Sequence, residues 1–250
     1  MKMLDNGIFE NEYIINIAQI GIHKTLTNKS FLSLMENLAG AHSAYCHFSF
    51  EDLEKDNLGW IILSWKIKVF KRPKLDDKVR VQTWGRKFNN LFVWRDFRVF
   101  DENGELCAIA TSMWCLIDYT KRKIAHMPSN LNDIYFKFPD KAVFGENSEE
   151  VIKIKIPDSD PINFDVYKVR RFDIDINKHV HNLNYVDIAY ETLPFDVFME
   201  KEYDNIIIEY KREIQYGEKV NSYLYQDGDR YVIVTKSEDE NTIHSVIELS

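Results

Sequence analysis

The sequence predicts an α+β protein made of two similar halves, each with one helix followed by about four mainly antiparallel strands. Two observations lead to this prediction. Helix and strand patterns occur in this order twice along the 250 residues. In addition, residues 67–79 (IKVFKRPKLDDKV) resemble residues 208–220 (IEYKREIQYGEKV), and both segments close on an acidic residue, a lysine and a valine. A similarity at so long a period indicates a duplicated unit rather than a solenoid.

The helix of the first half is expected over residues 28–45. Leu32, Met35 and Leu38 recur there at helical spacing, and Thr27 offers a capping oxygen just before the helix. The strands of this half are expected from β-branched and aromatic runs and from alternation with period two, at residues 60–70, 78–84, 91–100 and 107–118.

The pattern starts again after a less regular, acidic stretch. We expect a strand within residues 166–174, a short helix over 182–194, and strands at 206–214, 219–225, 230–236 and 242–249. A helix wrapped by an antiparallel sheet is the hotdog arrangement. We therefore predict two fused hotdog domains, at residues 1–135 and 161–250, joined by a linker at 136–160. Two unrelated α+β domains are the alternative.

Composition narrows the classes of partner and compartment. The net charge of −8 argues against free nucleic acid as a partner. Cys46, Cys107 and Cys115 are an odd number without metal-ligand spacing, which suits a reducing compartment. Acidic residues stand where a signal peptide needs an apolar run, and the longest apolar runs are too short to cross a bilayer. We expect a cytoplasmic protein with no membrane insertion, no metal and no cofactor.

A row of polar residues, Asp175, Asn177 and His179, precedes the helix of the second half. If residues 173–179 are extended, these side chains share one face, close to the free N–H groups of a helix start. His179 can move protons near neutral pH, and Asn177 can orient a water or donate to a carbonyl oxygen. The alternative interpretation of the same three residues is a polar turn in which the Asp and Asn side chains bond their own backbone.

Three segments resemble one family. Residues 173–186 (DIDINKHVHNLNYV) are similar to the acyl-ACP thioesterase signature, in which D-x-N-x-H-V-N-N precedes a tyrosine. Residues 209–214 (EYKREI) resemble the family motif E-Y-R-R-E-C, and residues 58–84 resemble its strand, proline and threonine-tryptophan segment. The resemblance spans roughly residues 8–249 in order. It implies a double-hotdog enzyme that hydrolyses fatty acyl thioesters carried on acyl carrier protein.

The resemblance implies catalytic roles for Asp175, Asn177, His179 and Glu213. Glu213 is then the favoured general base that activates a water, with direct nucleophilic attack as the other option. Asn177 and helix N–H groups polarise the thioester carbonyl, while His179 orients the water or assists proton transfer. Asp175 holds its neighbours. Taken by itself, Glu213 also reads as a solvated strand glutamate paired with a neighbouring cation.

The chain departs from the family pattern at two positions. His181 replaces the first asparagine after H-V, where altered packing or capping is expected. Ile214 replaces the cysteine after the glutamate, and isoleucine cannot act as a nucleophile, so a thiolate mechanism is excluded at that position. In the repeat alignment Arg72 stands where the second half has Glu213, and the first half has no D-x-N-x-H. We therefore expect one active site, in the second half, with the first half binding the acyl chain.

The implied partner, acyl carrier protein, is acidic, so docking on a negative chain needs a local basic patch. The basic residues considered are Lys66, Lys68, Lys71, Arg72 and Lys74, then Lys121, Arg122 and Lys123, and then Lys168, Arg170, Arg171, Lys211 and Arg212. The run at 168–171 is preferred because it leads into the polar row. Acyl-chain length and oligomeric state stay open, with a homodimer as one arrangement.

Three other functions fit parts of the pattern. An acyl-CoA thioesterase shares the chemistry and differs in the carrier, and a non-catalytic acyl-binding hotdog protein does not need the four polar residues together. A hotdog dehydratase is disfavoured because no G-H-F-P-like loop occurs. On the first helix, His42 is expected to be a packed or capping histidine, and Glu36 is expected to face solvent.

Overall fold

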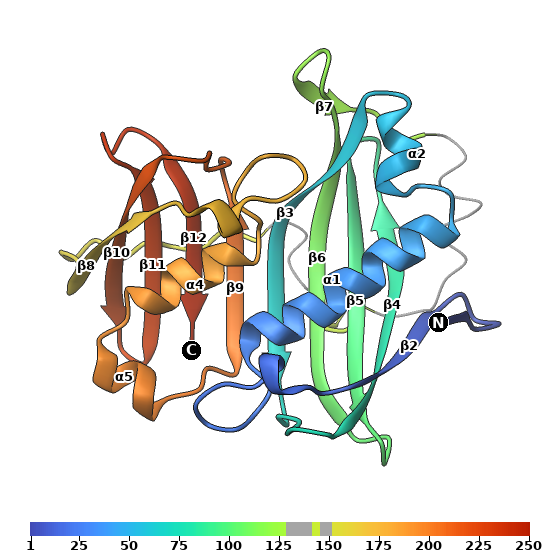
Figure 1. Ribbon diagram of the computed structural model, residues 1–250, viewed down its shortest axis with the longest axis horizontal. Helices are drawn as coiled ribbons and strands as arrows, with labels where there is room; N and C mark the ends of the chain where they lie inside the picture. Colours follow the sequence, from blue (N-terminus) through green and yellow to red (C-terminus); the bar gives the residue numbers. More distant parts are fainter. Residues whose placement is uncertain (129–141, 146–151) are drawn as a thin grey trace. The chain divides into compact units, whose positions relative to one another are not determined.

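The fold was obtained as a computed structural model that describes residues 1–128, 142–145 and 152–250 (Figure 1). The chain divides into two compact units. The first consists of Met1–Leu63 and Ile67–Val151, and the second of Ile152–Ser250 with Ser64–Lys66. Each unit sets a helix against an antiparallel sheet, which confirms the two hotdog domains predicted from the repeat. The expected linker lies partly outside the described residues, and its limits stay a prediction.

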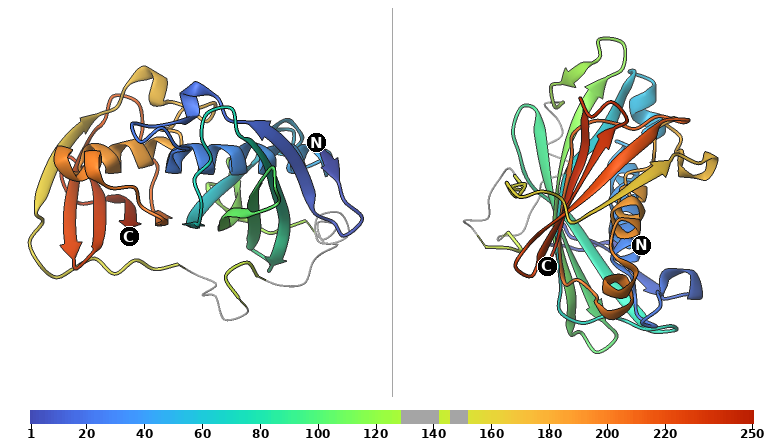
Figure 2. Two further views of the ribbon diagram at one scale, coloured as in Figure 1. Left: turned by 90° about the horizontal axis from the view of Figure 1, so that it is seen from below. Right: turned by 90° about the vertical axis from the view of Figure 1, so that its left-hand side faces the viewer.

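In the first unit, the 18-residue helix α1 (Asn28–Tyr45) lies along one face of the sheet (Figures 1 and 2). The strand order is β1 (Lys2–Met3), β2 (Phe9–Ile14), β4 (Lys78–Phe88), β5 (Phe92–Asp101), β6 (Leu106–Asp118) and β3 (Leu58–Val69), with β7 (Lys123–Ala125) beside β6. The short helices η1 (Ile17–Gln19) and α2 (Phe50–Glu54) flank α1 in the sequence. Leu32, Met35 and Leu38 are fully buried, so the helical spacing marks the face that packs on the sheet.

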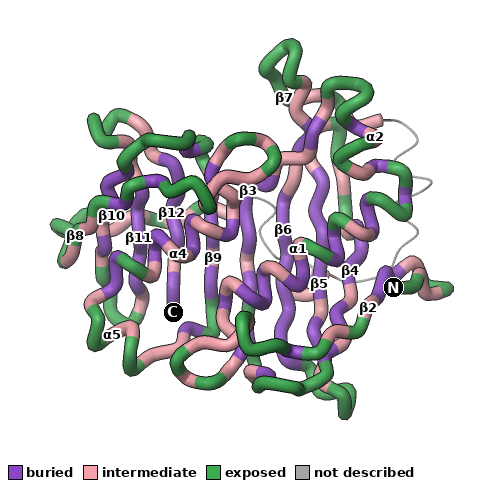
Figure 3. The backbone as a smooth tube through the Cα atoms, viewed as in Figure 1, coloured by how far each residue is buried: buried purple, intermediate pink, exposed green. Residues whose placement is uncertain are grey.

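The second unit repeats this design with a shorter helix, α4 (Asn184–Glu191). Its strand order is β9 (Asn205–Tyr210), β12 (Ile243–Leu249), β11 (Arg230–Ser237), β10 (Lys219–Asp227) and β8 (Asn163–Lys168). The helices η2 (Arg171–Asp173) and α5 (Phe195–Glu200) flank α4 in the sequence. Within each unit the strands carry most of the buried positions (Figure 3).

Several element predictions are right and several are wrong. The first helix begins and ends as predicted, and Thr27 caps it by accepting a hydrogen bond from Ser30 N at 3.1 Å. The strand expected within 166–174 ends at Lys168, because Asp173 accepts from Arg170 N at 2.6 Å and closes the turn of η2. The strand expected over 206–214 ends at Tyr210. Strand β2 and helix α5, which starts after Pro194, were not predicted.

The two units share local hydrogen bonds as well as element order. Leu26 N donates to Pro73 O at 2.8 Å, and Val180 N donates to Ile214 O at the same distance. The turn after each of these acceptors closes alike, through Asp77 in the first unit and Glu218 in the second. The similarity of residues 67–79 to 208–220 is therefore matched by equivalent backbone contacts, as expected for a duplication.

Candidate active site

The loop that carries the polar row is a tight turn and not an extended strand, so the predicted alternation of side chains is wrong. Ile174 and Val180 form an antiparallel bridge, and Asp175 N donates to His179 O at 2.9 Å. The turn is completed by Lys178, whose φ is 66°. Its N–H donates to Asp175 O at 3.0 Å. A left-handed residue shortens the loop and brings its two ends together.

Asp175 shapes this loop through its side chain. Its Oδ1 accepts from Asn177 N at 2.8 Å and from His179 N at 3.4 Å. These are the local side-chain to backbone bonds expected of an Asx turn. The carboxylate thus fixes the backbone on which the amide and the imidazole are mounted.

His179 lies opposite Glu213, two residues that the family resemblance implies for one site. His179 Nε2 is 3.4 Å from Glu213 Oε1. The two side chains keep 28% and 53% of their exposure, so water reaches the pair. The backbone sets this approach, because His179 forms a bridge with Gln215 and the adjacent Val180 N donates to Ile214 O. A proton acceptor and an imidazole therefore share one solvent-accessible point.

Glu213 is not held by its cationic neighbour Lys211. Lys211 pairs instead with Glu209, whose side chain is 7% exposed and also accepts a hydrogen bond from Ile154 N. The alternative of a strand glutamate neutralised by Lys211 is therefore not what the structure shows. Among the described residues, the Glu213 carboxylate instead approaches the His179 ring.

The backbone donors at the start of α4 are already used within the chain. The N–H groups of Val180, His181 and Asn184 donate to the carbonyls of Ile214, Asp173 and His181. Leu183 N donates to Asn182 Oδ1 at 2.8 Å. This leaves little support for the expectation that helix N–H groups polarise a carbonyl here. The Asn177 side chain carries an NH₂ group, which is a neutral hydrogen-bond donor.

The positions of the cysteines and of Ile214 argue against a cysteine thiolate as the nucleophile. Ile214 is fully buried. All three cysteines lie in the first unit and are buried as free thiols, and burial raises the pKa of both Cys107 and Cys115 to about 11. A thiol with so high a pKa is almost wholly protonated near neutral pH and is a poor nucleophile.

The corresponding place in the first unit has different chemistry. Arg72 stands where the second unit has Glu213, and its Nη1 donates to Leu26 O at 3.2 Å and to Asn28 Oδ1 at 2.9 Å. Gly21 and Thr25 occupy the places of Asp175 and His179 in the bridged turn. A guanidinium cannot accept a proton from water, so the position opposite this turn holds no carboxylate base.

On helix α1, His42 is packed, as expected. It is 1% exposed, stacks on Phe9, and its Nδ1 lies 2.9 Å from Arg95 Nη1. Burial, followed by the charge of Arg95, lowers the pKa of His42 to about 2, so the ring stays neutral and accepts from the guanidinium. Glu36 differs from its expectation, because its Oε2 is shielded from solvent.

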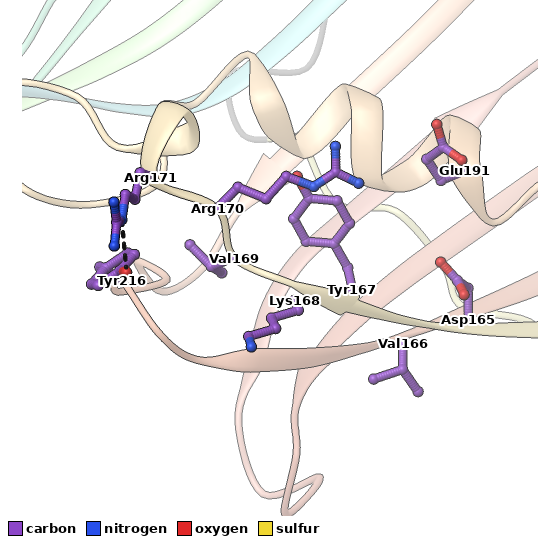
Figure 4. A pocket seen from close by; sticks show the side chains of 9 residues that line it. All are labelled: Asp165, Val166, Tyr167, Lys168, Val169, Arg170, Arg171, Glu191 and Tyr216. Atoms are coloured by element: carbon purple, nitrogen blue, oxygen red, sulfur yellow. Dashed lines mark hydrogen bonds between the residues drawn. The ribbon is translucent and has the colours of Figure 1, made fainter.

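A groove of about 470 Å³ lies along the edge strand β8 and the residues that follow it up to Arg171 (Figure 4). Its lining residues are Asp165, Val166, Tyr167, Lys168, Val169, Arg170, Arg171, Glu191 and Tyr216. The Arg170 guanidinium lies 5.5 Å from the centre of the Tyr167 ring, and Arg171 Nε donates to Tyr216 Oη at 3.5 Å. Phe172, the next residue, is fully exposed. The basic residues at 168–171, which the sequence favours for docking, thus line a groove on the surface.

Sequence reasoning did not single out two buried residues beside Glu213. Tyr185 contacts the backbone on both sides of Glu213, and His244 contacts its carbonyl oxygen. Tyr185 could have been found from the family signature, which contains a tyrosine at this place. No sequence pattern indicated His244.

Across the described residues, no group of three or more His, Cys, Asp or Glu side chains is arranged to hold a metal ion. Helices long and apolar enough to cross a membrane are likewise absent from residues 1–128, 142–145 and 152–250.

Comparison with known proteins gives matches over both units. The family model of the acyl-ACP thioesterase N-terminal domain matches residues 6–135, and that of the acyl-ACP thioesterase C-terminal domain matches residues 158–248. An oleoyl-acyl carrier protein thioesterase of Coriandrum sativum is 26% identical over 248 residues, which are 94% of this chain and 67% of that protein. Oleoyl-acyl carrier protein thioesterase 2 of Arabidopsis thaliana is 27% identical over 246 residues, 93% of this chain and 67% of that protein.

Solved structures share the fold. An acyl-ACP thioesterase from Bacteroides thetaiotaomicron superposes with a TM-score of 0.86 at 22% identity, covering 97% of this chain and 96% of that one. The 12:0-ACP thioesterase from Umbellularia californica superposes with a TM-score of 0.84 at 22% identity and the same coverage. At this identity the likeness supports the double-hotdog architecture.

Proposed function

Because this chain belongs to the acyl-ACP thioesterase family, we propose that it hydrolyses fatty acyl thioesters of acyl carrier protein at one site in its second unit. The observation that carries the assignment of the site is the 3.4 Å approach of His179 Nε2 to Glu213 Oε1. It joins two segments that lie 34 positions apart, between residues 179 and 213, at an exposed point where water and substrate can meet.

In the proposed reaction Glu213 accepts a proton from water while the water oxygen attacks the thioester carbonyl carbon. His179 orients that water, and the Asn177 amide donates to the carbonyl oxygen as negative charge develops there. The C–S bond then breaks and releases the carrier thiolate. A thiolate is a good leaving group, so the site needs no strong general acid. Asp175 keeps the loop in the geometry that these steps need.

The groove along β8 is the proposed docking surface for acyl carrier protein. Lys168, Arg170 and Arg171 supply three positive charges beside the two carboxylates of Asp165 and Glu191. The groove is thus locally positive on a chain whose net charge is −8, which favours an acidic partner at this place. The exposed Phe172 adds an apolar contact next to the basic side chains. The first unit is proposed to bind the acyl chain, since Arg72 takes the place of the carboxylate opposite its turn and its core is rich in large apolar side chains.

The test compares Glu213→Gln with Glu238→Gln on a panel of acyl thioesters that vary in chain length and carrier. Glu238 is a surface carboxylate of the same unit, paired with Lys219, and serves as the matched control. Loss of a general base is expected to lower kcat by at least about 100-fold in Glu213→Gln, and the control is expected to keep wild-type rates.

The same panel separates the alternatives. Faster turnover of acyl-CoA than of the matched acyl carrier substrate would assign the chain to acyl-CoA hydrolysis. A wild type that binds acyl groups without turnover would make it a binding protein. An active Glu213→Gln would refute the proposed site.

Two expectations concern the surroundings of the enzyme. We propose a cytoplasmic location, which the acidic composition and the three free thiols support, and which fluorescence microscopy of a tagged chain tests. A homodimer is the proposed assembly, and the mass measured by light scattering distinguishes it from a monomer.

A further inference from the structure

We propose that Tyr185 and His244 are positioning residues, which hold the backbone of Glu213 so that its carboxylate faces His179. The inference rests on the proposed role of Glu213 as the base. It concerns two buried polar side chains that touch neither reacting atoms nor solvent and that the hydrolysis scheme leaves unused. Both bond the short segment between β9 and the turn at Gly217, where Glu213 lies outside any strand.

Tyr185 bonds the backbone on both sides of Glu213. Ile214 N donates to Tyr185 Oη at 3.0 Å, and Tyr185 Oη donates to Arg212 O at 3.4 Å. The residue is 4% exposed and belongs to α4, where its ring also packs edge-on against Tyr210. Burial raises the pKa of Tyr185, so its hydroxyl stays protonated and keeps its donor role. One phenol oxygen therefore fixes the peptide groups before and after the base.

His244 bonds the same segment from strand β12. Its Nδ1 lies 3.2 Å from Arg212 O and 3.1 Å from Glu213 O. Carbonyl oxygens only accept, so Nδ1 must carry the hydrogen. The backbone of His244 takes part as well, because its carbonyl accepts from Lys211 N at 2.8 Å and from Arg212 N at 3.2 Å.

The link to His179 runs through one neighbouring residue. Ile214, which Tyr185 holds by its N–H, accepts from Val180 N at 2.8 Å through its carbonyl. Val180 directly follows His179. A shift of the segment around Glu213 therefore changes the distance between the carboxylate and the imidazole without disturbing the sheet.

The first unit provides a natural control. Its backbone has the equivalent contacts, since Phe70 N and Lys71 N donate to Cys107 O at 2.7 and 3.1 Å. Cys107 thus stands where the second unit has His244. Phe31 follows Leu26 by five positions, as Tyr185 follows Val180.

The unit with Arg72 in place of the base therefore lacks both the hydroxyl and the imidazole. Phe31 and Cys107 are fully buried, so the same local fold forms without these two polar groups. In the first unit Pro73, which has no N–H, stands where the second has the buried Ile214, so the Tyr185 hydroxyl meets a backbone donor that the first unit lacks. Both side-chain bonds occur in the unit that carries Glu213.

The experiment introduces the residues of the first unit into the second, as Tyr185→Phe and His244→Cys. Misplacing a reacting group by a fraction of an ångström to 1 Å costs up to about 100-fold in rate, so kcat is expected to fall roughly 10- to 100-fold with KM unchanged. His244→Asn, whose side-chain NH₂ reaches the place of Nδ1–H, is expected to recover most of the rate. Tyr203→Phe, a change at a fully buried tyrosine that packs on Tyr190 and Tyr231, is the control and should keep wild-type kcat.

Combination with Glu213→Gln separates positioning from general packing. If Tyr185 and His244 act through Glu213, Tyr185→Phe and His244→Cys lower the residual rate of Glu213→Gln no further. An equal further loss in that background, or wild-type kcat in both folded single variants, overturns the inference and leaves the proposed function intact. An active Glu213→Gln overturns the proposed function, and the positioning role with it.

Discussion

Asp175 lies at the start of the bridged loop at residues 174–180. Its carboxylate accepts hydrogen bonds from two backbone N–H groups, those of Asn177 and His179. The family resemblance implies a catalytic position, and elementary turn chemistry predicts an Asx turn. Both apply to the same side chain, because a loop that presents two functional groups must itself be fixed. The distances place the carboxylate on the backbone, which favours a positioning role over direct proton transfer.

Substitution of Asp175 tests this role. Asparagine keeps an Oδ1 acceptor, so Asp175→Asn is expected to retain kcat within a few-fold. Alanine removes the acceptor of two N–H groups, and Asp175→Ala is expected to lose about 10- to 100-fold in kcat as the loop loosens. Steady-state kinetics of both variants, with circular dichroism to verify folding, measure the difference. Equal loss in both variants would show that the charge of Asp175 matters for the chemistry itself.

At the level of elements, periodicity predicted those parts of the fold whose side chains pack in a regular pattern. Helix α1 begins and ends at the predicted residues because one apolar face and one capping threonine define it. The loop at residues 174–180 could not be predicted from periodicity. Its shape depends on one left-handed residue, Lys178, and on bonds from Asp175 to its own backbone, and neither leaves a periodic trace. Strand β9 ends at Tyr210 because the next residues bond to His244.

Strand β8 and helix η2 carry the groove that we propose for carrier docking. Reversal of two charges in its groove, Arg170→Glu with Arg171→Glu, is expected to raise KM for acyl carrier protein substrates at least about tenfold with little change in kcat. The matched control is Arg122→Glu with Lys123→Glu, which changes the net charge equally at another exposed basic cluster. Initial rates at several salt concentrations measure the effect, since electrostatic docking weakens as salt increases.

An unchanged KM in the double variant at 170 and 171 would exclude this groove as the docking surface. An increase in KM in the control pair alone would place docking on the cluster at 121–123 instead.

At the scale of the whole molecule, duplication explains why the same turn occurs in both units, while the proposed catalytic residues occur in the second unit. In each unit the turn before the helix is bridged alike and closes on a left-handed lysine, Lys24 with a φ of 62° and Lys178 with a φ of 66°. The second unit places a carboxylate opposite this turn, and the first places the Arg72 guanidinium there. The same backbone turn therefore carries the proposed site in the second unit, whereas in the first it lies beside the start of the long helix α1.

Arg72→Ala tests this division of roles across the chain. Arg72 donates to Leu26 O and to Asn28 Oδ1 at the start of α1, so its removal is expected to cost the first unit about 1–2 kcal/mol in free energy of unfolding. Hydrolysis at a temperature where the variant is folded is expected to stay near the wild-type rate, because the proton acceptor lies in the other unit. Denaturant unfolding and steady-state kinetics of Arg72→Ala and Glu213→Ala measure both effects. A folded Arg72→Ala without activity beside an active Glu213→Ala would place the reaction in the first unit and refute the proposed site.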